Sequence, residues 1–197
     1  RALVADDIRI EETVIKINDE FYASNNESLK IALEKNASVV NLLAGNYELP
    51  SISNGDVTIS GGKDVVITID KPNLTGSDVT FTGVTVKGSG YATGVQHVNT
   101  VTYNNVTIDG EMCLYGAKNV FNECTFNLAD GQYIWTYGSD VTEFNNCTFN
   151  TVSKGICIFN EGVNEYYLEV NDSEFTASET DDKAAIQMHT EKGIKGT

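Results

Sequence analysis

The sequence contains five versions of one eight-residue segment: VTFTGVTV (79–86), VTYNNVTI (101–108), NVFNECTF (119–126), TEFNNCTF (142–149) and LEVNDSEF (168–175). Apolar residues recur at the third, sixth and eighth positions, and polar residues mostly separate them, which is typical of strands with one buried face. The fourth and fifth positions are rich in Asn, which tolerates the left-handed backbone of a tight corner. The segment therefore predicts two short strands joined by a corner.

A third strand is expected further along each repeat. Two columns recur every 22 positions: one is Tyr91, Cys113, Trp135 and Cys157, and the other is Thr93, Tyr115, Tyr137 and Phe159. A period in this range is typical of solenoids, in which each repeat packs only against its neighbours. The third strands are expected at 90–94, 112–116, 134–138, 156–160 and 185–190. Three short strands per coil of about 22 residues predict an all-β fold, the parallel β-helix.

Two internal columns follow from this alignment. The eighth positions should form one continuous stack in the core: Val86, Ile108, Phe126, Phe149 and Phe175. The fourth positions should stack at the corner as an asparagine ladder: Asn104, Asn122, Asn145 and Asn171.

With this pattern of corners and strands, residues 25–197 resemble the pectate-lyase-like family of right-handed parallel β-helices. Asn25 or Asn26 is a candidate N-cap, followed by a helix with Leu29, Ala32 and Leu33 on one face. The resemblance implies that this helix, near 27–35, caps the first coil. We accordingly divide the chain into lead-in strands or a linker (1–24) and a β-helix (25–197).

Residues 13–45 also resemble the lead-in of β-helix modules in large surface proteins of anaerobic gut bacteria. This resemblance implies a secreted or cell-surface location. Because EKGIKGT (191–197) is too short and Gly-rich for a capping helix, the natural protein is expected to continue past Thr197. An end-to-end contact at the C-terminal coil is therefore a further expectation.

Charge limits the choice of partners. The formal net charge is −15, which disfavours nucleic acid, whose phosphates are bound by basic clusters. No apolar stretch approaches the length of a membrane span. Lyases of the resembled family use a basic residue, usually Arg, yet the arginines here are Arg1 and Arg9, both before the β-helix. Lys118 and Lys154 lie in the coils and are more simply interpreted as solvated corner residues.

The third strands carry the candidate binding site. Alternation should turn one set of side chains inward: Met112, Leu114, Ile134, Ile156, Ile158, Ile186 and Met188. The opposite set should face outward, with Gln187 nearby: Tyr91, Tyr115, Trp135, Tyr137, Phe159 and His189. Exposed aromatic side chains in a strip can dock sugar rings. The alternatives are that the aromatic rings stack on one another to stabilise the sheet, or that a loop or another domain covers them.

Metal and cysteine chemistry give weaker indications. Glu179, Asp181 and Asp182 in one loop, with Asp130 and Asp140 in others, are candidate calcium ligands, although such acids are usually just solvated. No other cofactor is indicated. Cys124 and Cys147 share an inward column in adjacent coils and are interpreted as small core residues rather than a disulfide.

Two functional hypotheses remain. The first is a non-catalytic extracellular β-helix module, a spacer or adhesin that binds polysaccharide or glycoprotein glycan through the aromatic strip. The alternative is a polysaccharide lyase or glycoside hydrolase. The missing coil arginine and the acidic charge favour the first.

Overall fold

A computed structural model describes residues 8–11, 14–51, 55–70, 72, 78–88, 99–115, 117–137, 139–159, 167–178 and 184–189. For 8–11, Tyr137 and His189 it describes the backbone alone.

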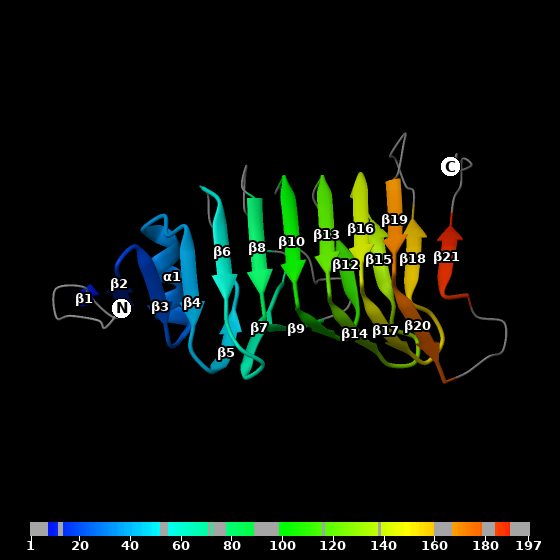
Figure 1. Cartoon of the computed structure of the whole chain (residues 1–197), viewed down its shortest axis with the longest axis horizontal. Helices are drawn as coiled ribbons and strands as arrows, with labels where there is room; N and C mark the ends of the chain where they lie inside the picture. Colours follow the sequence, from blue (N-terminus) through cyan, green and yellow to red (C-terminus); the bar gives the residue numbers. More distant parts are fainter. Residues whose placement is uncertain are drawn as a thin grey trace.

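The chain forms a parallel β-solenoid of about 6 turns, with coils about 22 residues apart. Its coils stack along the long axis of the molecule, and each contributes strands to separate sheets (Figure 1). The first sheet has the order β1 (Ile8–Glu11), β2 (Val14–Ile17), β3 (Glu20–Ala23), β4 (Val39–Leu42), β6 (Val57–Ser60), β8 (Asp78–Thr82), β10 (Thr100–Asn104), β13 (Lys118–Asn122), β16 (Val141–Asn145) and β19 (Tyr167–Asn171).

The other two sheets are shorter. The second sheet has the order β5 (Gly45–Glu48), β7 (Val65–Thr68), β9 (Thr85–Lys87), β11 (Thr107–Asp109), β14 (Thr125–Leu128), β17 (Thr148–Thr151) and β20 (Glu174–Ala177). The third sheet has the order β12 (Met112–Leu114), β15 (Ile134–Tyr137), β18 (Ile156–Phe159) and β21 (Ile186–His189). The third-strand predictions at 112–116, 134–138, 156–160 and 185–190 are confirmed within a few residues, and most of 90–94 lies outside the described residues.

The repeated segment makes the corner between the first and second sheets, as predicted. The fifth position takes a left-handed backbone in every version, with φ between 48° and 70°; these residues are Gly83, Asn105, Glu123, Asn146 and Asp172. Non-glycine residues adopt this region rarely, and Asn is enriched among those that do. The sharp bend therefore comes from the fifth position, while the fourth is free to form side-chain contacts across coils.

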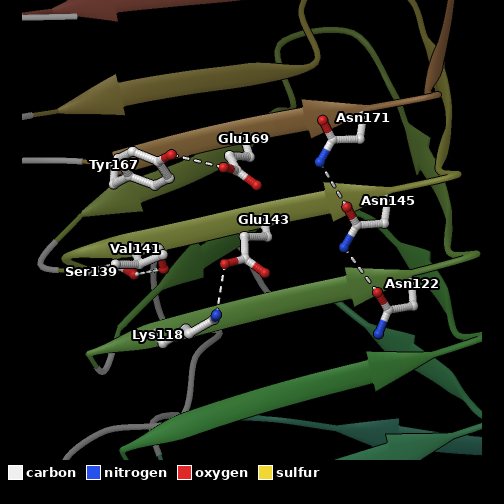
Figure 2. A network of polar contacts seen from close by, with 9 residues as sticks. All are labelled: Lys118, Asn122, Ser139, Val141, Glu143, Asn145, Tyr167, Glu169 and Asn171. Atoms are coloured by element: carbon white, nitrogen blue, oxygen red, sulfur yellow. Dashed lines mark hydrogen bonds and ion pairs between the residues drawn. The ribbon is translucent and has the colours of Figure 1, made fainter. Parts of the chain in front are cut away.

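The predicted core stack and asparagine ladder are both confirmed. Phe126 and Phe149 stack with centroids 4.4 Å apart, and Phe149 and Phe175 at 4.3 Å. At the corner, the Nδ2 atom of each Asn donates to the Oδ1 atom of the Asn one coil earlier. The distances are 2.9 Å from Asn122 to Asn104, 3.0 Å from Asn145 to Asn122 and 3.0 Å from Asn171 to Asn145. Figure 2 shows the last two of these contacts.

The N-terminal end contains the helix of the described chain, α1 (Asn26–Glu34), next to β3 and β4 (Figure 1). Asn25 is its N-cap: the Asn25 side chain accepts from the backbone of Ser28, and the Ser28 side chain accepts from the backbone of Asn25. Leu29, Ala32 and Leu33 are buried, as the apolar face predicted. The segment predicted as lead-in strands or a linker includes an antiparallel run, because β1 pairs with β2 and β2 with β3.

One buried polar cluster breaks the apolar pattern of the first sheet. Asn119 occupies the inward column of Val101 and is 2 % exposed. Its Nδ2 atom donates to the backbone oxygen of Tyr115 and to Oγ of Ser139, both at 2.9 Å. The Ser139 hydroxyl in turn donates to the backbone oxygen of Val141 at 3.0 Å (Figure 2). Through these hydrogen bonds the cluster connects the turns after β12 and β15 to strands β13 and β16 of the first sheet.

Candidate functional site

An aromatic cluster lies on the third sheet. Trp135 stacks on Tyr133 with centroids 4.9 Å apart and on Phe159 at 4.7 Å. All three side chains are half-buried. The ring faces engaged in this stacking are not available to a sugar. For Trp135 and Phe159, therefore, the alternative that the aromatic rings stack on one another holds at least in part.

Charged groups border this cluster. The indole Nε1 atom of Trp135 donates to the Glu111 carboxylate. The Lys154 ammonium lies 5.4 Å from the centroid of the Tyr133 ring, within the range of a cation–π contact. Burial, followed by the neighbouring Cys157 and Glu111, raises the pKa of the Tyr133 hydroxyl. Tyr133 therefore stays a neutral hydroxyl at physiological pH, able to donate and to accept hydrogen bonds.

The sequence missed Tyr133 and Glu111, although a signal for them existed. Glu111, Tyr133 and Gly155 are spaced by 22 positions, the same period that identified the neighbouring columns. Lys154, which we interpreted as a solvated corner residue, makes a ring contact instead.

The structure brings together some of the predicted site residues. Trp135 and Phe159 are in contact, and Tyr115 is half-buried just after β12. Gln187 pairs with Cys157 in the same column, and its buried Oε1 atom has no hydrogen-bond partner among the described residues. Tyr91 lies outside the described residues, as do the side chains of Tyr137 and His189. Met188, predicted to point inward, is 56 % exposed because β21 is an edge strand of the third sheet.

A polar groove of about 460 Å³ lies at the ends of the second-sheet strands. Its polar side chains come from the ends of the second-sheet strands and the following turn: Lys87, Asp109, Asn127, Asn150 and Gln132. Gly88, Gly110, Leu128 and Ala129 complete the lining. Gly110 directly precedes Glu111, the hydrogen-bond partner of Trp135, and Gln132 directly precedes Tyr133, so two lining residues are chain neighbours of the aromatic cluster or its border.

Comparison of the chain with protein-family models, with curated proteins and with solved structures gave no match.

The candidate calcium ligands divide into two groups. Glu179, Asp181 and Asp182 lie outside the described residues, whereas Asp130 and Asp140 are exposed. Among the described residues, no three His, Cys, Asp or Glu side chains converge as metal ligands would. No helix in the described part of the chain is long and apolar enough to cross a membrane.

The four cysteines are free and buried, which agrees with the interpretation of Cys124 and Cys147 as core residues. The Cys124 thiol donates to the backbone oxygen of Tyr103 at 3.3 Å. A hydrogen bond with Cys147, together with burial, raises the pKa of Cys124. At the outward column of the third sheet, Cys113 and Cys157 flank Trp135 on the neighbouring strands and are at most 1 % exposed.

Thr136, beneath the aromatic cluster, provides a prediction about stability. It lies in the inward column of Leu114 and Ile158, is fully buried, and its hydroxyl has no hydrogen-bond partner among the described residues. We expect Thr136→Val, which keeps the shape and removes the hydroxyl, to raise the free energy of unfolding by about 1 kcal/mol. Urea unfolding followed by circular dichroism measures the change. A loss of stability would mean that the hydroxyl has a partner.

Proposed function

We propose that the chain is a non-catalytic module of an extracellular bacterial protein that binds glycan in the polar groove next to the aromatic cluster. In this proposal the solenoid is a right-handed β-helix of the pectate-lyase-like type, α1 covers its first coil, and the module acts as a spacer or adhesin. The observation that carries the proposal is the composition of the groove, in which amide, carboxylate and ammonium groups from successive coils face one open space.

The chemistry of the groove supports a sugar ligand. Sugar hydroxyls both donate and accept hydrogen bonds, and the side chains of Asn127, Gln132 and Asp109 offer both functions. In this proposal Tyr133, which directly follows the lining residue Gln132 in the chain and stacks on Trp135, supplies an apolar surface beside the groove. Polar groups that fix orientation next to an apolar surface are typical of small-ligand sites.

A glycan array with two matched variants tests the proposal. We expect the unmodified chain to bind at least one glycan, and Asn127→Ala to weaken that binding about tenfold, the cost of one good hydrogen bond to a ligand. Asn46→Ala is the control, because Asn46 is an exposed Asn on β5 of the same sheet, away from the groove. Equal binding by all three proteins would place the ligand elsewhere, and no binding by the folded, unmodified chain would contradict glycan recognition.

The alternative function, a polysaccharide lyase or glycoside hydrolase, would use the charged groups of the same groove, Lys87 and Asp109. Incubation with polygalacturonate, with ultraviolet absorbance of unsaturated products as the readout, tests the lyase. Product formation that Lys87→Ala abolishes would replace the binding proposal with catalysis.

A further inference from the structure

The polar side chains of the groove form one column across four coils. Lys87 of β9, Asp109 of β11, Asn127 of β14 and Asn150 of β17 are in register, each paired with the next. Neighbouring strands are about 4.8 Å apart, so the column extends for about 14 Å along the direction in which the coils stack. A ligand that follows this column must be linear and must repeat at about the spacing of the coils.

Hydrogen bonds among the groove residues occupy some of their amide groups and leave others for a ligand. Asn150 Nδ2 donates to Asn127 Oδ1 at 3.0 Å, so the Nδ2 atom of Asn127 points away from Asn150, toward the coil of Asp109. Gln132 Oε1 accepts from the backbone N–H of Ala129 at 2.9 Å, which leaves the Gln132 amide nitrogen as the group for a ligand. The groove thus combines oriented amide donors with one carboxylate acceptor.

The charges around the groove disfavour an anionic ligand. Lys87 and Asp109 balance each other within the lining. Two further acids directly follow lining residues: Glu111 follows Gly110, and Asp130 follows Ala129. A ligand carboxylate between the coils of Asp109 and Asn127 would lie beside Asp109 and farther from Lys87, which belongs to the coil before Asp109. Unit charges of the same sign at about 4 Å repel by about 1 kcal/mol even in bulk water.

We propose that the groove selects an uncharged linear glycan over a uronic acid polymer, with the sugar chain lying along the stacking direction at about one sugar per coil. This proposal rests on the proposed function and specifies the ligand class of the same groove. Asp109 is the residue that sets the selection: its carboxylate accepts from sugar hydroxyls and repels sugar carboxylates.

Calorimetric titration of the full chain with defined oligosaccharides tests the selection. The probes are β-1,4-linked glucose oligomers of two to six units and hexagalacturonate, all at low salt. We expect the affinity for the glucose series to rise up to about four units and then to level off, because the column spans four coils. Hexagalacturonate should bind at least tenfold more weakly than the glucose hexamer.

Asp109→Asn removes the negative charge of the side chain and keeps its shape. It should strengthen hexagalacturonate binding about fivefold, the factor that corresponds to about 1 kcal/mol of repulsion, and the gain should shrink as salt screens the charge. Glu48→Gln is the matched control, because Glu48 of β5 lies in the same column of the second sheet three coil steps before Asp109. It removes the same charge and should change neither affinity.

The outcomes distinguish the two proposals. Equal or tighter binding of hexagalacturonate by the unmodified chain would overturn the selection while leaving glycan binding in place. Affinity that keeps rising beyond four units, or that is already complete at two, would overturn the alignment along the column. No binding of either class by the folded chain would overturn both the selection and the proposed function.

Discussion

Phe126→Ala is expected to lower the free energy of unfolding by about 3–5 kcal/mol, the usual cost of removing a buried aromatic ring. Phe126 is fully buried and stacks on Phe149 of the next coil. It also meets Phe121 and Phe144 edge to face, with centroids 5.3 Å and 5.6 Å away. The strands around the ring are fixed by their ladders, so the cavity cannot collapse, and the cost should lie in the upper part of the range. Chemical denaturation followed by far-ultraviolet circular dichroism measures the effect.

Phe175→Ala is the matched control. Phe175 belongs to the same column but lies in the edge strand β20 and is only partly buried, so its loss should cost clearly less. Equal costs at the two positions, or a cost at Phe126 below about 1 kcal/mol, would contradict the idea that the column is a continuous core.

Asn119→Ala is expected to cost about 2–4 kcal/mol, because it removes the hydrogen bonds of a buried side chain to two acceptors at about 1–2 kcal/mol each. These acceptors are the backbone oxygen of Tyr115 and the Ser139 hydroxyl oxygen. Loss of the Asn119 side chain should therefore loosen the turns after β12 and β15 more than the sheet itself. Hydrogen exchange should show faster exchange at 139–142, and denaturation should show the loss of stability.

A double-mutant cycle with Ser139→Ala measures how much of the lost stability comes from the Asn119–Ser139 hydrogen bond and how much from the cavity. Because Asn119 and Ser139 are bonded at 2.9 Å, the combined cost should be smaller than the sum of the two single costs by about 0.5–3 kcal/mol. Additive costs would show that the two side chains stabilise the fold independently.

The parts of the fold that could be predicted are those in which one residue type recurs. Phe126 and Phe149 fill equivalent positions, as do Asn122 and Asn145, and a repeated residue at a repeated position reveals both the strand and its register. Asn119 could not be predicted as a structural residue, because its position in the repeated segment otherwise holds Val, Val, Thr and Leu, and a strand pattern favours an apolar side chain there.

The groove could not be predicted for a different reason. Lys87, Asp109, Asn127 and Asn150 are chemically unlike one another, and each alone has the appearance of a solvated strand end. The spacing between equivalent residues also varies, from 18 positions between Val101 and Asn119 to 30 between Cys157 and Gln187. Loops of different lengths account for these differences in spacing. Only the strand pairing therefore shows which polar side chains become neighbours.

The antiparallel strands at the N-terminal end affect how the chain can polymerise. A stack of parallel, in-register coils has the geometry of a cross-β fibril, in which each layer can template the next. Here the first sheet continues beyond β4 with β3, β2 and β1, while among the described residues the second sheet ends at β5 and the third at β12. A coil of another molecule that approached this end could not extend all three ladders at once. Among the described residues, β19, β20 and β21 are the edge strands of the three sheets at the opposite end, so templated growth would depend on that end.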